Sequence, residues 1–272
     1  MNRLPTFARV DGGLIRVSVR GEGRPLLLIM GLGANIEMWD PLERELNDRG
    51  FQTITYDAPG NGESPARVVP PCMPGLARQA AHLLDALGFP RVDVLGVSFG
   101  GAVAQELVLR NPNRVRRIVL AATTCGLGGV PGNPLALALV ANPLRYLSPS
   151  FFRATAPFLY GKGAAGNDQL LRLHTAARHA RPPSLWGFAG QVVAAAGWTS
   201  LPWLRHVHAP VLVLTGDGDR IVPDINGRIL AARIPDARHV RCTGGHLFLL
   251  EHPSTCADTI ADFLVNCTMV CP

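Results

Sequence analysis

The sequence predicts an α/β fold, in which a mostly parallel central sheet is flanked by helices and carries an inserted helical lid. Three observations predict it. Short apolar runs typical of buried strands alternate with segments of helical spacing, both early and late in the chain. This alternation stops in the middle of the chain, and one strand passes into a helix through a glycine-rich corner. Such alternation implies parallel strands joined by right-handed crossovers, with both faces of the sheet covered.

Length and composition limit the number of domains. The chain has 272 residues, of which 47% are hydrophobic, and this suits one large core better than two independent domains. We expect residues 1–124 to form the first part of the core, residues 125–205 the lid, and residues 206–272 the second part.

The elements before the lid follow one another at short intervals. Residues 1–23 are polar and rich in glycine, and the first strand is expected only after them. Apolar runs predict the strands, and apolar residues three or four positions apart predict the helices. The strands are expected at 26–30, 53–56, 92–97 and 115–122, and the helices at 38–48, 76–87 and 100–109.

The lid and the elements after it differ in character. Residues 125–205 hold many prolines, alanines and aromatics with irregular helical spacing. Beyond them the alternation resumes, and the tail 266–272 is expected to be loose. The later strands are expected at 211–215 and 240–242, and the later helices at 225–233 and 247–265.

Charge and cysteine usage exclude several classes of partner. The net charge of +6 comes almost wholly from arginines that are interleaved with acids, and no basic run with stacking aromatics suggests nucleic acid. None of the six cysteines forms a CxxC pair or lies at zinc spacing from histidines. We therefore expect reduced thiols, no metal and no cofactor.

No apolar run approaches the ~20 residues that a membrane-spanning helix needs. The N-terminal residues also lack the apolar stretch of a secretory signal. The expected location is the cytoplasm, without a membrane span.

Ser98 lies at the corner between a strand and a helix, in the sequence Gly96-Val97-Ser98-Phe99-Gly100. A strand that turns sharply into a helix strains the residue at the corner, and its neighbours two positions away must be very small. The serine hydroxyl is then held beside a helix N-terminus, which favours negative charge. This pattern is typical of a nucleophile elbow, although an ordinary serine-capped helix would share the motif.

A serine nucleophile needs a base and an acid that orients the base. His246 alone among the eight histidines follows a late strand through a glycine turn, so we predict it to be the base. Asp217 and Asp219 both follow the strand at 211–215. Asp219 lies at the far lip of the loop and is the preferred acid, whereas Asp217 suits a turn cap.

The developing oxyanion needs two backbone N–H groups. Phe99, directly after the serine, is expected to supply one. The loop Gly31-Leu32-Gly33 follows the first strand, and there we assign Leu32, with Gly31 letting the backbone approach the substrate. The loop lacks the third glycine of a dinucleotide-binding fingerprint.

These residues together resemble the α/β-hydrolase superfamily. The resemblance is more specific in several stretches and covers about residues 25–264. Residues 29–35, 38–39, 96–101, 120–123, 197–204 and 244–249 resemble the intracellular medium-chain-length poly(3-hydroxyalkanoate) depolymerases. Phe99 departs from that family, in which tryptophan often occupies this position, and the chain ends soon after its last helix.

The lid composition is consistent with a hydrophobic substrate. Its aliphatic and aromatic residues will mostly pack its own core, but some should face the serine. Trp198 and Trp203 are the leading candidates for substrate binding, because they bracket the place where the lid rejoins the core. No charged cluster in the lid sequence suggests an ionic substrate.

The residues and the resemblance together imply a serine ester hydrolase. Its expected partner is a small-molecule ester or a 3-hydroxyacyl polyester, with a storage-granule surface as a candidate location. A general carboxylesterase or lipase and an acyl-CoA thioesterase remain alternatives. A non-catalytic binding protein would be expected to lack the nucleophile, the base or the acid, and Ser98, His246 and Asp219 are all present. Haloalkane dehalogenase and epoxide hydrolase chemistry would need an aspartate in place of Ser98.

Overall fold

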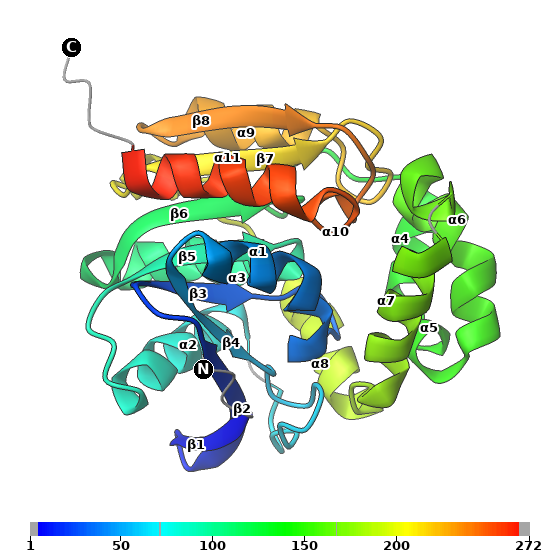
Figure 1. Cartoon of the computed structure of the whole chain (residues 1–272), viewed down its shortest axis with the longest axis horizontal. Helices are drawn as coiled ribbons and strands as arrows, with labels where there is room; N and C mark the ends of the chain where they lie inside the picture. Colours follow the sequence, from blue (N-terminus) through cyan, green and yellow to red (C-terminus); the bar gives the residue numbers. More distant parts are fainter. Residues whose placement is uncertain (1–4, 71, 167, 267–272) are drawn as a thin grey trace.

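The computed structural model describes residues 5–70, 72–166 and 168–266. A sheet of eight strands forms its centre, in the order β1-β2-β4-β3-β5-β6-β7-β8 (Figure 1). The strands from β4 to β8 in this order pair in parallel, which confirms the predicted α/β class. Residues 267–272 of the tail that was predicted to be loose lie outside the described residues.

Each of the six predicted strands is present, with bounds that differ by up to three residues, and two further strands lie near the N-terminus. Two strands were not expected in residues 1–23, and they form an antiparallel hairpin that pairs with β4. Asp11-Gly12 makes its two-residue turn, with both residues at positive φ. Asp-Gly is a strong hairpin signal, so the sequence did carry a clue to this part of the sheet. The strands are β1 Thr6–Val10, β2 Gly13–Arg20, β3 Arg24–Ile29, β4 Phe51–Tyr56, β5 Val92–Val97, β6 Val115–Ala121, β7 Val211–Gly216 and β8 Ala237–Cys242.

Helices cover both faces of the sheet (Figure 1). On one face α2, α3 and α9 pack against the strands, and on the other face α1, α10 and α11 do so. The last helix, predicted as one piece, is divided between α10 and α11, and Pro253 begins the second piece. The core helices are α1 Asp40–Asp48, α2 Met73–Ala86, α3 Phe99–Arg110, α9 Ile225–Arg233, α10 Phe248–Glu251 and α11 Pro253–Asn266, with short 3₁₀ helices at Ile36–Trp39, Pro112–Arg114 and Leu204–His206.

Each parallel strand contributes to two hydrophobic layers, because successive side chains point to opposite faces. In β3, for example, Leu27 packs with the layer under α2 and α3. Leu26 and Leu28 pack with the layer under α1 and α11. Burial on both faces explains why these strands read as continuous apolar runs in the sequence.

The segment predicted as the lid lies between β6 and β7 and forms a helical layer beside the sheet (Figure 1). Its helices share a small hydrophobic cluster around Phe152 and Leu159 with Ile221 and Val222 from the loop after β7. The two ends of the segment are joined at its base, where the Leu127 amide donates to the Trp198 carbonyl and the Ser200 amide to the Cys125 carbonyl. The helices are α4 Pro134–Ala141, α5 Leu144–Leu147, α6 Pro149–Gly166, α7 Asp168–Ala180 and α8 Leu185–Ala195.

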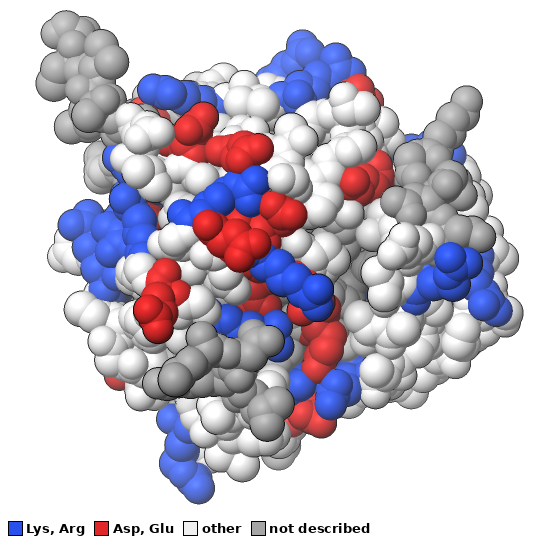
Figure 2. Space-filling view, in the orientation of Figure 1, with Lys and Arg blue, Asp and Glu red and all other residues white. Residues whose placement is uncertain are grey.

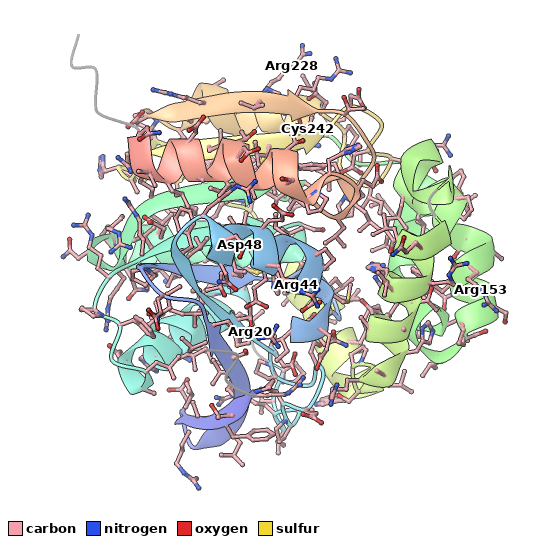
Figure 3. The ribbon with its side chains drawn as sticks, viewed as in Figure 1. Arg20, Arg44, Asp48, Arg153, Arg228 and Cys242 are labelled. Carbon is pink, nitrogen blue, oxygen red and sulfur yellow. The ribbon has the colours of Figure 1, made fainter. Side chains whose placement is uncertain are left out.

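Charged side chains are dispersed over the surface. Figure 2 shows acidic and basic groups side by side across the centre of this face. Three of the labelled arginines lie apart from one another, with Arg44 on α1, Arg153 on α6 and Arg228 on α9 (Figure 3). On this face the positive charge forms no continuous basic stripe.

The corner between β5 and α3 is crowded by backbone atoms. Ser98 has φ 54° and ψ −118°, a backbone conformation that residues other than glycine rarely adopt. A Cβ atom on Gly100 would lie 2.0 Å from the carbonyl oxygen of Ile29 in β3, and one on Gly96 would lie 2.5 Å from the Gly100 carbonyl oxygen. Only glycine at these positions therefore lets α3 begin this close to the sheet.

Gly100→Ala should destabilise the fold, because its methyl group meets backbone that cannot move aside cheaply. Overpacking of this kind typically costs about 1–3 kcal/mol, so we expect a loss of that size in the free energy of unfolding measured with urea. Gly13→Ala is the matched control, since its Cβ would have ordinary contacts at 3.7 Å or more. Equal stability losses in the two variants would contradict this explanation of the corner.

Candidate active site

Ser98 lies at the carboxyl end of the central strand β5 and immediately before α3. Phe99 is the first residue of that helix, so its N–H group has no intrahelical acceptor. The helix dipole adds to the positive potential at this point. The corner predicted from the glycine pattern thus exposes the serine to two pockets that meet at its side chain.

His246 and Asp219 come from the loops after β8 and β7 and form a hydrogen-bonded pair. The distance from His246 Nδ1 to Asp219 Oδ2 is 2.7 Å, and the Asp219 carboxylate is buried. The other carboxylate oxygen, Oδ1, accepts from the amides of Ile221 and Val222 at 2.8 and 2.9 Å. These contacts fix the carboxylate and leave Nε2 of the imidazole available. His246 and Ser98 line the same pocket.

Asp217, the alternative acid, has a different role in the structure. Its Oδ1 atom accepts from the amide of Gly244 at 3.0 Å. It therefore joins the loop after β7 to the glycine turn before His246. The structure brings Asp219, and not Asp217, to the imidazole.

The loop after β3 places Leu32 beside Ser98, and both residues line the two pockets. A chain of buried hydrogen bonds holds this loop to the lid. The Gly33 amide donates to Gln191 Oε1 of α8 at 2.9 Å, and Gln191 donates to Asn61 Oδ1 at the same distance. Asn61 in turn donates to the Ala34 carbonyl at 2.9 Å. No local pattern in the sequence indicated that Gln191 and Asn61 hold this loop.

The carbonyl of Leu32 is held from the lid side by the hydroxyl of Tyr146, which donates to it. This contact fixes the plane of the peptide between Leu32 and Gly33. The amides of Leu32 and Phe99 are the pair expected at an oxyanion hole, and both residues border the larger pocket next to Ser98.

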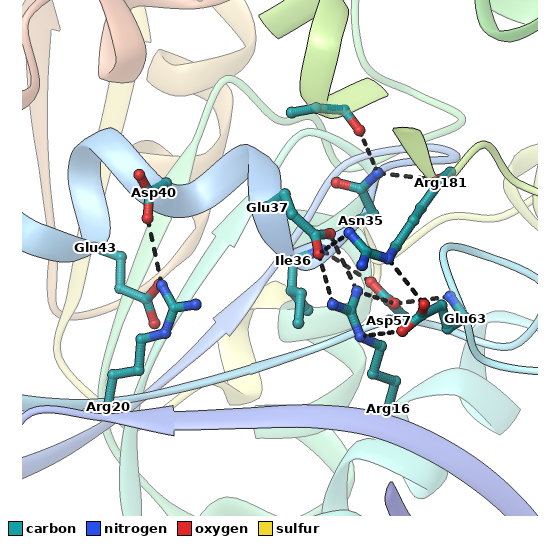
Figure 4. A network of polar contacts seen from close by, with 11 residues as sticks. Arg16, Arg20, Asn35, Ile36, Glu37, Asp40, Glu43, Asp57, Glu63 and Arg181 are labelled. Carbon is teal, nitrogen blue, oxygen red and sulfur yellow. Dashed lines mark hydrogen bonds and ion pairs between the residues drawn. The ribbon is translucent and has the colours of Figure 1, made fainter. Parts of the chain in front are cut away.

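A network of charged residues holds Ile36 and Glu37, which follow this loop in the chain (Figure 4). Arg16 of β2 pairs with Glu37 at 2.6 Å, with Glu63 at 2.8 Å and with buried Asp57 at 3.2 Å. Arg181, just after α7, pairs with Glu37 and Glu63 as well, which ties the lid to the core. Partial burial would raise the pKa of Glu37, but the hydrogen bonds and charge of Arg16 hold it below its usual value.

Asp57 connects two segments of the chain beside the site. Its buried carboxylate accepts from the amides of Ile36 and Glu63 at 2.8 and 3.0 Å. Burial raises the pKa of this carboxyl despite these hydrogen bonds and the nearby charge of Arg16. Asp57 thereby holds the segment that follows the Leu32 loop.

Two pockets meet at Ser98. The larger one, of about 430 Å³, is mainly apolar and is bordered by Phe99, Leu137 and Trp198. The smaller one, of about 70 Å³, contains Gly31 and His246. Trp198 thus lies where a substrate wall was expected. Trp203 lines neither pocket; it is 55% exposed and lies beside His206, so it is not a wall of the site.

The smaller pocket also contains charged lid residues, which corrects the expectation that the lid holds no charged cluster. Arg145 of α5 and Arg178 of α7 line it, together with Tyr160 and His174. Both arginines are buried. They are far apart in the sequence and belong to different helices, so no local run of charge indicated that they would meet.

Burial holds the pKa of His174 well below its usual range, and the charges of Arg178 and Arg145 act in the same direction. His174 is therefore neutral at pH 7. Its Nε2 atom lies 3.2 Å from Arg178, and its ring contacts Phe152 edge-on.

The described part of the chain contains no group of three or more histidine, cysteine or acidic residues that could hold a metal ion. Cys72, Cys125, Cys242 and Cys256 are free thiols. Within the same residues, no helix is both long and apolar enough to span a membrane.

Comparisons with known proteins agree with this architecture. The family described as the alpha/beta hydrolase fold matches residues 24–253. A poly(3-hydroxyalkanoate) depolymerase from Ectopseudomonas oleovorans is 40% identical over 94% of this chain and 90% of its own length. A 2-hydroxy-6-oxo-6-phenylhexa-2,4-dienoate hydrolase from Burkholderia cepacia is 30% identical over 93% of this chain and 91% of its own length.

Solved structures show the same fold. A hydrolase from Pseudomonas aeruginosa PA01 has a TM-score of 0.82 at 28% identity, covering 96% of this chain and 98% of that one. A thermophilic esterase from Thermogutta terrifontis has a TM-score of 0.81 at 26% identity, covering 97% of this chain and 99% of that one.

The lowered pKa of His174 predicts a pH dependence of stability. Below pH ~6.5 the unfolded chain binds a proton at this residue that the folded chain does not bind, so the free energy of unfolding falls as pH falls. His174→Gln should remove up to ~1.4 kcal/mol per pH unit of this dependence between pH 6.5 and 5.5. Urea unfolding at several pH values measures it.

His239, whose pKa is also lowered by burial, is present in both proteins and cancels from the comparison. Identical pH dependences in the wild type and in His174→Gln would show that His174 binds its proton equally in the folded and unfolded chain, contrary to this account.

Proposed function

The chain belongs to the α/β-hydrolase fold family, and on that premise we propose that it is a serine ester hydrolase with Ser98 as nucleophile, His246 as base and Asp219 as the orienting acid. The observation that carries the proposal is the convergence of three loops. The strained corner holds Ser98 at the pocket that His246 lines, and Asp219 holds the far side of the imidazole at 2.7 Å.

In the first half of the reaction, His246 Nε2 takes the proton of Ser98 Oγ as this oxygen attacks the ester carbonyl. The carbonyl oxygen becomes an oxyanion, which accepts from the amides of Leu32 and Phe99. The tetrahedral intermediate collapses, and the alcohol leaves with the proton from His246. An acyl group then remains on Ser98.

In the second half, His246 takes a proton from water while the water oxygen attacks the acyl-enzyme carbonyl. Collapse releases the carboxylic acid, and the proton returns to Ser98 Oγ. Asp219 stabilises the imidazolium in both halves without becoming protonated itself. The net change is one ester and one water converted into one acid and one alcohol.

The proposed substrate is a hydrophobic 3-hydroxyacyl ester, as an oligomer or a polyester. Two observations support this class. A relative with 40% identity is a poly(3-hydroxyalkanoate) depolymerase. The larger pocket beside Ser98 is mainly apolar and offers about 430 Å³, which suits an alkyl chain. Rates on p-nitrophenyl esters of rising chain length, an acyl-CoA and a medium-chain polyester latex distinguish this substrate class from a general carboxylesterase, a lipase or a thioesterase.

Ser98→Ala should abolish ester hydrolysis and covalent labelling by a fluorophosphonate, because no other group at the corner can form the acyl-enzyme. The fold should persist, since the hydroxyl is not part of the core. Turnover of p-nitrophenyl octanoate and a circular dichroism melt check both points. Turnover close to wild type would remove Ser98 as the nucleophile.

Asp219→Asn should lower kcat by roughly 10³–10⁴-fold, because an amide favours the wrong imidazole tautomer. Asp217→Asn is the matched control. Its amide oxygen can still accept from the Gly244 amide, so the loss should be small. Comparable losses in both variants would mean that Asp219 is not the orienting acid.

Trp198→Ala should weaken hydrolysis of longer esters more than that of acetate, because it removes a wall of the larger pocket. Each additional buried CH₂ is worth about 0.8 kcal/mol at most, part of which is lost to ordering of the chain. We expect the ratio of kcat/KM for octanoate over acetate to fall about tenfold, which is ~1.4 kcal/mol.

Trp203→Ala is the control for this experiment, since that exposed side chain borders neither pocket. It should keep the chain-length profile of the wild type. A wild-type profile that is highest for acetate would itself argue against the polyester substrate.

A further inference from the structure

Two buried arginines line the smaller pocket without a carboxylate to neutralise them. Arg145 is 5% exposed and Arg178 is 2% exposed. Both border the pocket that also contains Ser98 and His246. Among the residues that the structure describes, no aspartate or glutamate forms an ion pair with either guanidinium.

The contacts of the two side chains are with neutral groups. Arg145 donates to the Val140 carbonyl at 3.2 Å and to the Tyr160 hydroxyl at 3.3 Å. Arg178 lies over the rings of Tyr146 and Phe152, 4.6 and 4.8 Å from their centroids. These contacts position the guanidinium groups but supply no negative charge.

Three donors of these side chains have no acceptor among the residues that the structure describes. They are Nε of Arg145 and both Nε and NH1 of Arg178. A buried charge without a counter-charge is costly, and an unsatisfied donor adds to that cost. A guanidinium presents donors in a planar fork that matches a carboxylate, so an anion entering this pocket would offset both costs.

The position of His246 indicates which part of an ester would carry this anion. His246 gives its proton to the departing alcohol, so the alcohol must leave on the side of His246. His246 borders the smaller pocket with the two arginines, whereas the larger apolar pocket borders Phe99 and Trp198. The acyl chain therefore belongs in the larger pocket and the alcohol in the smaller one.

We propose that Arg145 and Arg178 bind a carboxylate on the alcohol portion of the substrate. This inference rests on the proposed ester hydrolysis and specifies its substrate: a hydroxyacyl oligomer cleaved at the ester next to its free carboxyl end. Ser98 attacks the carbonyl of the preceding unit, and the terminal hydroxy acid leaves with the proton from His246 and its carboxylate intact. Water then releases the shortened oligomer from Ser98.

The direct test compares two substrates that differ in one charge. They are the dimer of 3-hydroxyoctanoate with a free carboxylate and the methyl ester of that dimer, with cleavage of the internal ester followed in both. A hydrogen bond to a charged group is worth about one to two powers of ten in binding. We expect kcat/KM of the wild type to be about 10- to 100-fold higher for the free acid. Equal values for the two dimers would overturn the proposal without any variant.

Arg178→Gln and Arg145→Gln should each lower the ratio of kcat/KM for the acid over the methyl ester, toward one. Arg153→Gln is the matched control, because this exposed arginine lies on α6 and points away from the core in Figure 3. It should keep the wild-type ratio. An unchanged ratio in both pocket variants would show that the two arginines only hold the lid together.

A second pair of measurements separates failure of this proposal from failure of the proposed function. Hydrolysis of p-nitrophenyl octanoate reports the serine esterase alone, because its alcohol carries no carboxylate. Competitive inhibition of that reaction by 3-hydroxyoctanoate reports the anion site, and its inhibition constant should rise about tenfold or more in Arg178→Gln. Active esterase without such inhibition would refute the carboxylate site and leave the esterase standing.

Discussion

The backbone turn at Ser98 is the constraint on which the rest of the site depends. It requires glycine on both sides, because α3 begins in contact with the carbonyl of Ile29 in the neighbouring strand. This closeness places the first amide of α3 and the loop after β3 around one point, the serine hydroxyl. The parallel order of β3, β5, β6, β7 and β8 then brings the loops that follow these strands to the same edge of the sheet.

The lid is a structural part of this site and not only a cover. Gln191 and Tyr146 reach from the lid to the two sides of the loop that carries Leu32. Arg181 joins the lid to the charged network shown in Figure 4. The position of the peptide between Leu32 and Gly33 therefore depends on lid packing, and the same packing brings Arg145 and Arg178 to the pocket beside Ser98. Movement of the lid would change the proposed oxyanion site and the proposed anion site together.

Local patterns in the sequence predicted the strands and turns that depend mainly on residues close together in the chain. The buried strands were recognisable because both of their faces are apolar. The positions of Ser98, Asp219 and His246 after strand ends were recognisable because glycines lie beside each of them. The β1–β2 hairpin was not predicted, because apolar residues alternate with Arg16 and Ser18 in β2 and form no continuous apolar run. The sequence could not show that Trp203 is exposed, or that Arg145 and Arg178 line one pocket. Both facts depend on tertiary packing alone.

A crystal structure of the protein after reaction with an alkyl phosphonate would test the central claim most directly. The account predicts phosphorus bonded to Ser98 Oγ, the phosphoryl oxygen about 2.7–3.1 Å from the amides of Leu32 and Phe99, and the alkyl chain in the larger pocket. Phosphorus on another residue, or a phosphoryl oxygen turned away from both amides, would contradict it.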